Sequence, residues 1–279
     1  MPIHDQGYRR YGGRREPPGR RWWVIARAGL LERLRERRFL ALLLFAWAPF
    51  VVRAVQIYVA STFTQASFLA PSAGTFREFF DQQSLFVFFV TIYAGAGLIA
   101  NDTRANALQL YLSRPLTRLE YIVGKLVTLL VFLAGVTWAP AMLLLLLQMM
   151  FAGNTVFVRE HLFLFPAITI YSAIQILVSA LAVLALSSLS RSRRFVSIMF
   201  AGILFFTAAM YQVLRSITGS TAWAWISPGD TLGVIADALF RIPGRTAIPV
   251  AAAVCAVVGL AAASIWILER RVRAVEVVT

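Results

Sequence analysis

Long apolar runs alternate with short polar segments along most of this chain. A helix needs about 20 mainly apolar residues to cross about 30 Å of hydrocarbon. Six runs meet this requirement: 39–60, 84–100, 126–150, 163–187, 195–214 and 247–268. The second run is the shortest, and its Gly95 and Gly97 are typical of a span packed tightly against other helices. The pattern predicts an all-α integral membrane protein with six transmembrane helices.

The composition and the placement of charge support this prediction. Of the 279 residues, 59% are hydrophobic and only 14% are charged, whereas soluble domains carry about 25% charged residues. Of the 27 Lys and Arg residues, 21 lie before Phe39, in 101–125, in 188–194 and after 268. Because basic residues beside spans stay in the cytoplasm, we expect both termini to be cytoplasmic.

The formal net charge of +14 does not indicate nucleic-acid binding. Most of this charge lies beside membrane spans, where it sets the topology and meets the anionic headgroups of the lipid bilayer. Residues 1–21 are rich in Gly, Pro and Arg and lack apolar periodicity, so we expect a disordered basic cytoplasmic arm. Residues 22–279 then form a single six-helix transmembrane domain.

The segment 22–38, just before the first run, predicts an amphipathic helix. Its apolar residues fall on one stripe: Trp23, Ala26, Leu30 and Leu34. Arg33, Arg35 and Glu36 point mostly away from that stripe. We interpret the segment as an elbow helix lying in the membrane interface. The alternative is that it is only the positively charged flank of the first span.

Polar residues within the spans are few. Arg53 lies in the first run, where an unpaired arginine costs several kcal/mol, so it is either an anchor at the nearer interface or part of a substrate pathway. The other five runs contain no Asp, Glu, Lys, Arg or His, which argues against a proton-driven carrier and favours an amphiphile over a small ion as substrate. Gln175 and Gln212 are further pathway candidates, although such residues more often bond helix to helix.

The sequence shows no catalytic constellation and no metal site. It has two histidines, His4 and His161, which are too few for a histidine metal cluster and lie outside the runs. Gly124 and Lys125 are followed by Leu126, whereas a phosphate-binding loop requires Ser or Thr there. We therefore expect no cofactor on this chain and no ATPase activity of its own.

The segment 100–125, between the second and third runs, is polar and contains several helix signals. Asp102 or Thr103 can cap the N-terminus of a short helix that reaches about residue 112. The larger apolar side chains of this helix are those of Leu108, Tyr111 and Leu112. We therefore expect a short helix at the cytoplasmic surface.

A second helix follows after a break. Pro115 disfavours helix at Arg114, and Thr117 and Glu120 have the separation of a capping box. This helix continues into the third span. A loop that only returned the chain could be much shorter, so we expect this device of helix, break and helix to be functional.

The segment 215–246, before the last run, is placed on the outer side by the charge rule. Ser227 or Asp230 can cap a short helix through about Phe240. Its apolar residues share one face: Leu232, Ile235, Ala236 and Leu239. The helix is either an outer gate that includes Asp230 or a simple interfacial anchor.

These motifs together resemble those of ABC transporter permeases of the type-two exporter class. In that class an acidic residue after the second span precedes a helix, a Ser-x-Pro-x-x-Arg pattern and a Gly-Lys pair. The corresponding residues here are Asp102, 108–112, Ser113, Pro115, Arg118, Gly124 and Lys125. The six spans, the basic elbow and the outer helix extend the resemblance to the whole chain. Asn106 is a departure, since many members carry a Gly-Thr step there.

The resemblance implies that the loop helix is a coupling helix, seated in a cleft of a separate ATP-binding subunit that holds ATP and Mg. The residues implied at that interface are Asp102, Arg104, Asn106, Leu108, Tyr111, Leu112, Arg114 and Arg118. It further implies an exporter in the inner membrane of a prokaryote, paired with a second copy or a homologous permease. The alternatives are a loop lying only on lipid headgroups, and an ATP-independent channel, facilitator or scaffold.

Overall fold

The computed structural model describes residues 21–63, 72–107, 117–151 and 162–272. In this part of the chain six helical stretches are long and apolar enough to cross a membrane. They are Arg37–Thr62, Ala73–Arg104, Arg118–Phe151, Leu164–Leu189, Arg193–Thr218 and Val250–Arg271. All six predicted spans are therefore confirmed, although the second and third begin earlier than predicted. Residues 1–20 of the predicted arm lie outside the described residues.

The first three spans are interrupted and the last three are single helices. The first span consists of α2 (Arg37–Phe45) and α3 (Ala48–Thr62). The second consists of α4 (Ala73–Val90), the π-helical turn η2 (Thr91–Gly95) and α5 (Ala100–Arg104). The third consists of α7 (Arg118–Val136) and α8 (Trp138–Phe151). The single helices are α10 (Leu164–Leu189), α11 (Arg193–Thr218) and α13 (Val250–Arg271). The helices outside the spans are α1 (Arg21–Leu34), the short 3-10 helix η3 (Thr221–Ile226) and α12 (Pro228–Leu239).

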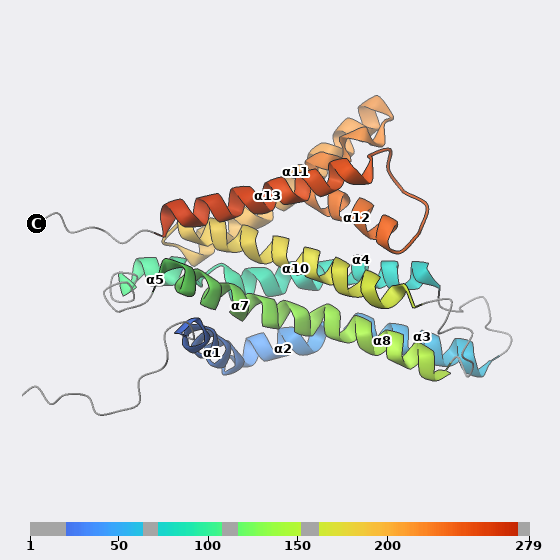
Figure 1. Cartoon of the computed structure of the whole chain (residues 1–279), viewed down its shortest axis with the longest axis horizontal. Coiled ribbons are helices and arrows are strands. Elements are labelled where there is room, and N and C mark those ends of the chain that lie inside the picture. Colours follow the sequence, from blue (N-terminus) through green and yellow to red (C-terminus); the bar gives the residue numbers. More distant parts are fainter. Residues whose placement is uncertain (1–20, 64–71, 108–116, 152–161, 273–279) are drawn as a thin grey trace, which may run out of the picture.

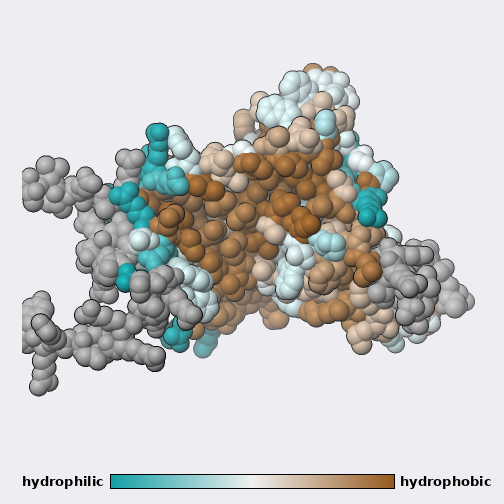
Figure 2. Space-filling view, in the orientation of Figure 1, coloured by the Kyte–Doolittle hydropathy of each residue, from teal (hydrophilic) through white to brown (hydrophobic). Residues whose placement is uncertain are grey.

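The spans form one elongated bundle (Figure 1). Helix α1 lies at one end of the bundle, and α13 ends there; we call this the termini end. Helix α4 begins near the opposite end, which we call the far end. On the face shown in Figure 2, hydrophobic residues form a broad band across the middle of the bundle, and hydrophilic residues gather towards its two ends. This distribution is that of a protein whose middle lies in hydrocarbon.

The second, third and fourth spans form the centre of the bundle. In their most apolar windows 61%, 56% and 61% of the residues are buried, against 17% in the first, fifth and sixth spans. Large side chains of α11, such as Phe205 and Phe206, are more than half exposed. The first, fifth and sixth spans therefore present surfaces that lipid or another membrane protein would cover.

Helix α1 lies directly against α7. A Cβ on Gly124 would lie 2.8 Å from the backbone oxygen of Trp22, and one on Gly29 would lie 2.9 Å from the Thr128 hydroxyl. The two glycines thus allow an approach that larger residues would prevent. A helix is therefore present in the segment where the elbow helix is predicted, but its role as an elbow and its interfacial position remain predictions.

The four residues of the apolar stripe predicted for the elbow helix do not share one environment in the structure. Ala26 is buried and Leu30 packs against the core, while Trp23 and Leu34 are exposed. The helix also ends at Leu34, earlier than predicted.

The expectation that Arg33 points away from the packed face is wrong. Arg33 is buried, and its Nη1 lies 2.6 Å from Glu36 Oε1, which supplies the opposite charge that burial of an arginine requires. Partial burial raises the pKa of Glu36, but its hydrogen bonds with Tyr93 and Arg33 outweigh that effect and lower the pKa below its ordinary value.

Two of the interruptions share one buried side chain, Gln83 of α4. The first span breaks before Pro49 and the third breaks before Pro140. Because proline has no N–H, Pro140 leaves the carbonyl of Val136 without its helical donor. Gln83 Nε2 donates to this carbonyl and, at 3.0 Å, to the carbonyl of Ala46. One amide group therefore donates to a carbonyl at each of the two breaks.

The interruption of the second span is satisfied from α10. The Ser187 hydroxyl donates to the Ala96 carbonyl at 2.9 Å and accepts from the backbone N–H groups of Ile99 and Ala100 at 3.1 and 3.0 Å. A Cβ on Gly95 would lie 2.6 Å from the Val183 side chain. The tight packing predicted for this glycine is therefore confirmed.

We predict that Gln83→Leu destabilises the protein by about 1–3 kcal/mol, because it leaves two buried carbonyl groups without a donor. Thermal unfolding in lipid nanodiscs measures the effect. Gln82→Leu, at the exposed neighbouring position, is the matched control and changes stability by less than about 0.5 kcal/mol. Equal effects of the two substitutions would contradict the bridging role of Gln83.

Candidate functional site

Asp102 fixes the junction between the second and third spans at the termini end. Its Oδ2 accepts a hydrogen bond from the Tyr121 hydroxyl at 2.7 Å and lies 2.7 Å from Lys125 Nζ. Both partners belong to α7, and Tyr121 is fully buried. The carboxylate therefore joins the end of the second span to the beginning of the third.

The predicted capping box at the start of α7 is confirmed. Thr117 Oγ1 accepts from the backbone N–H of Glu120 at 3.2 Å, and Glu120 Oε2 accepts from the backbone N–H of Thr117 at 2.9 Å. These bonds satisfy donors that the first turn of a helix leaves free. The third span therefore has a defined beginning at Arg118.

The prediction that Asp102 or Thr103 caps a helix is wrong. Both lie inside α5, where the Thr103 hydroxyl donates to the Ile99 carbonyl at 3.0 Å. The carboxylate of Asp102 is instead occupied by its partners on α7. Helix α5 ends at Arg104, and Asn106 follows in the left-handed conformation, with φ of 53°.

That conformation gives a physical reason for the departure at Asn106. Glycine adopts positive φ most readily, and asparagine tolerates it better than most other residues. Arg104, Asn106 and Arg118 are exposed beside the junction. Four of the residues implied at the ATPase interface lie outside the described residues: Leu108, Tyr111, Leu112 and Arg114.

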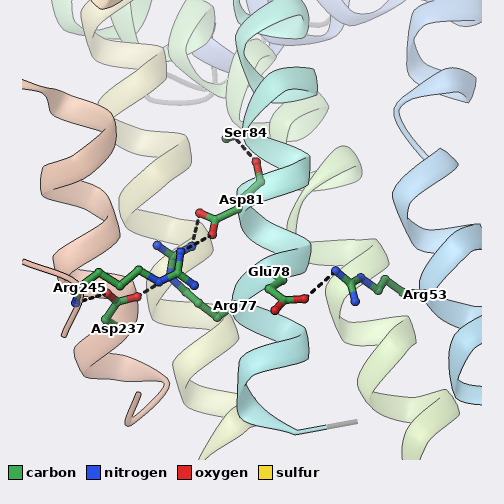
Figure 3. A network of polar contacts seen from close by, with 7 residues as sticks. All are labelled: Arg53, Arg77, Glu78, Asp81, Ser84, Asp237 and Arg245. Carbon is green, nitrogen blue, oxygen red and sulfur yellow. Dashed lines mark hydrogen bonds and ion pairs between the residues drawn. The ribbon is translucent and has the colours of Figure 1, made fainter. Parts of the chain in front are cut away.

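A group of charges with a buried centre joins α4 to α12 towards the far end (Figure 3). Arg77 Nε donates to Asp237 Oδ1 at 2.8 Å, and Arg77 Nη1 pairs with Asp81 Oδ1. Arg245 Nη1 lies 3.1 Å from Asp81 Oδ2, and the Arg245 backbone N–H donates to Asp237 Oδ2 at 3.3 Å. Arg77 and Asp237 are both almost fully buried. The charges of this group compensate one another, as burial requires.

The sequence reasoning missed this group because it began the second span at residue 84. The helix begins at Ala73. At its start the backbone N–H of Ser72 donates to Thr75 Oγ1 at 3.1 Å. The expectation that five spans lack ionisable residues is therefore wrong, since Arg77, Glu78 and Asp81 lie in α4. The four-residue spacing of Arg77 and Asp81 was the available sequence signal.

Arg53 has a specific partner that neither sequence alternative included. Its Nη2 lies 3.0 Å from Glu78 Oε2 (Figure 3). Its Nη1 donates to Gln56 Oε1 at 2.8 Å. Arg53 is buried while Glu78 is more than half exposed. The pair joins the first span to the second and neutralises the arginine inside the protein.

A cavity of about 490 Å³ lies between α4, α10, α11 and α12. Of the predicted pathway residues, Gln175 and Asp230 line it, Gln212 is exposed on α11, and Arg53 is not among the lining residues. The buried Gln175 Oε1 and Thr91 Oγ1 have no hydrogen-bond partner among the described residues. Such unpartnered polar atoms in a cavity can bind a ligand.

Helix α12 lines the cavity towards the far end. It runs from Pro228 to Leu239, and the Ser227 hydroxyl caps it by accepting from the Asp230 backbone N–H at 3.4 Å. The predicted helix is thus confirmed, with Ser227 as its cap. Its Ile235 and Ala236 are buried in the protein. The helix is held to α4 through Asp237, so it can move only if that ion pair moves or breaks.

We predict that Arg77→Met and Asp237→Asn each destabilise the protein by about 3–5 kcal/mol, because each leaves a buried charge without its partner. The double variant costs less than the sum, which thermal unfolding of all four proteins measures as a double-mutant cycle. Arg245→Met, at a half-exposed position, costs less than about 1 kcal/mol. Additive effects of the two buried substitutions would contradict the ion pair.

Comparison with known proteins identifies the family. No curated protein matches the sequence. The family described as ABC-2 family transporter protein matches residues 23–271, which include all six spans, the Asp102 junction and the cavity. This family supplies membrane permeases that work with an ATP-binding subunit and have no ATPase site of their own. The chain therefore belongs to the ABC-2 family of transporter proteins and is a multi-pass ABC transporter permease.

Proposed function

We propose that this permease is the membrane subunit of an ATP-driven exporter and that the segment between α5 and α7 receives the ATP-binding subunit. The observation that carries the proposal is the contact of Asp102 with Tyr121 and Lys125. It fixes both ends of the segment at one point, so a displacement of the segment acts on the second and third spans together. ATP and Mg bind in the partner subunit.

The charge at the junction suits a protein partner. Arg104 and Arg118 are exposed on either side of the segment, while Lys125 is already paired with Asp102. Arginines at the rim of an interface form charge-assisted hydrogen bonds with carboxylates of a partner. An acidic cleft in the ATP-binding subunit would therefore complement these two side chains.

The basic residues of the described spans support cytoplasmic termini. Most of them lie towards the termini end, among them Arg118, Lys125, Arg193, Arg194, Arg270 and Arg271, whereas Arg53, Arg77 and Arg215 lie towards the far end. The positive-inside rule then places the α5–α7 segment in the cytoplasm, where an ATP-binding subunit has access to ATP. The inner membrane of a prokaryote is the location that fits this topology.

The weakly buried spans support assembly with a second permease. The first, fifth and sixth spans have only 17% of their apolar windows buried, and α11 exposes large apolar side chains such as Phe206 and Ile217. A second copy or a homologous permease packed against the exposed face of α11 would complete a transport unit. Lipid would cover whatever the partner leaves exposed.

We predict that gentle purification in native lipid retains an ATP-binding protein, identified by mass spectrometry. The double change Tyr111→Ala and Arg114→Glu is expected to reduce its recovery at least about tenfold, because it removes an apolar side chain and reverses a charge at the implied interface. The same two substitutions at exposed far-end positions, Tyr58→Ala and Arg215→Glu, form the control and leave recovery unchanged.

Intact protein that carries no ATP-binding subunit would contradict the proposal and favour a channel, facilitator or scaffold. Recovery that is insensitive to the double change would remove the segment from the interface and leave the permease assignment in place.

A further inference from the structure

The cavity is long and narrow. Along α4 its lining runs from Arg77 to Thr91, which at about 1.5 Å per residue is about 21 Å. On α10, which runs in the same direction as α4, the lining runs from Tyr171 to Ala182. A volume of about 490 Å³ over that length leaves a mean cross-section of about 23 Å². A space of this shape accommodates one extended alkyl chain.

The two ends of the cavity differ in polarity. Towards the termini end its walls are apolar, formed by Val87 and Phe88 of α4, Ala182 of α10 and Leu204 of α11. Towards the far end they carry the charged group and the N-terminal turn of α12. Thr91 and Ser179 are polar exceptions in this half, and the Thr91 hydroxyl has no hydrogen-bond partner among the described residues. The cavity is therefore amphipathic along its length.

The charged end has an excess of negative charge. Arg77 and Arg245 contribute two positive charges, and Asp81, Asp237 and Asp230 contribute three negative charges, which leaves one negative charge among the described lining residues. Arg77 and Arg245 are held by Asp81 and Asp237, whereas Asp230 forms no ion pair within the described part of the chain. Asp230 is therefore the carboxylate available to a cation.

Neutral groups near the charged end also suit a cation. Phe80 and Tyr171 line the cavity there, with ring centroids 4.9 Å apart in an edge-to-face arrangement. Aromatic faces attract quaternary ammonium groups. Gln175 Oε1 is buried on the same helix as Tyr171 without a donor among the described residues, and an amide oxygen stabilises positive charge. These groups disfavour an anionic headgroup.

The side wall between α4 and α11 is built from aromatic side chains. The Phe88 ring lies 6.0 Å from that of Phe200 and 5.5 Å from that of Phe205, centroid to centroid. Phe205 is 63% exposed on the outside of the bundle. Phe88 lines the cavity and Phe205 lies on the outside, so this pair of rings stands between the cavity and the bilayer.

We propose that this cavity binds a single-chain cationic amphiphile, with its alkyl chain along Val87, Ala182 and Leu204 and its cationic headgroup beside Asp230. The ligand enters from the bilayer past Phe88 and Phe205. That this molecule is the exported cargo rests on the proposed function, whereas its binding to the permease does not.

Equilibrium binding to the full chain in phosphatidylcholine nanodiscs tests the proposal. The probes are radiolabelled hexadecyltrimethylammonium and hexadecyl sulfate, which share one chain and differ in headgroup charge, and empty nanodiscs correct for partition into lipid. We expect the ammonium to bind at least about tenfold more tightly than the sulfate, which corresponds to about 1.4 kcal/mol. Equal or tighter binding of the sulfate would overturn the proposal.

Two adjacent alanines of α11 provide a matched pair of variants. Ala208 lines the cavity, while Ala209 is exposed on the outside. Ala208→Trp fills the narrow space and is expected to weaken ammonium binding at least about tenfold, whereas Ala209→Trp leaves it unchanged. Ala208→Trp protein that binds the ammonium as the unaltered chain does would contradict binding in this cavity.

Asp230→Asn tests the headgroup site separately and retains the size of the side chain. We expect it to lower the preference for ammonium over sulfate to about one, while binding of the alkyl chain persists. An unchanged preference for ammonium would contradict the role of Asp230. This preference can be measured even if the Ala208→Trp protein does not fold. No ATP-binding subunit is present in these assays, so their failure and the failure of the proposed transport function are distinguishable.

Discussion

The side-chain amide of Gln83 is the contact on which the rest of the bundle depends. Hydrocarbon offers no water to a broken helix, so each carbonyl that a break frees must find its donor within the protein. Gln83 supplies that donor to the breaks at Ala46 and Val136 from its place in the second span. Ser187 does the same for the break in the second span itself. The interruptions are therefore fixed features of the bundle.

This requirement makes the second span the connecting element of the molecule. Towards the far end it is joined to α12 through Arg77 and Asp237 and to the first span through Glu78 and Arg53. At the termini end Asp102 joins it to the third span. A permease must relate events at its cytoplasmic surface to the opening of a path on the other side. In this chain one deeply packed span makes contacts at both ends of the bundle, and the cavity lies along it.

Much of the fold could be predicted because its signals are local. The capping box of Thr117 and Glu120 and the Ser227 cap depend on residues three apart, and the close packing at Gly95 follows from a glycine in an apolar run. The ion pair of Arg77 and Asp237 joins residues 160 positions apart, so no local pattern revealed it. The polar residues at the start of α4 also lowered its hydropathy and concealed where the helix begins. The buried face of α1 could not be assigned because Gly29, rather than a bulky apolar residue, sets its contact with α7.

The central claim is that an ATP-binding subunit docks on the segment that Asp102 holds between the second and third spans. Site-specific photocrosslinking in native membranes tests it most directly. A photoreactive amino acid at Tyr111 is predicted to form a crosslink to an ATP-binding protein, while the same group at the exposed far-end residue Tyr58 forms none. Crosslinks from position 111 to lipid alone would contradict the account.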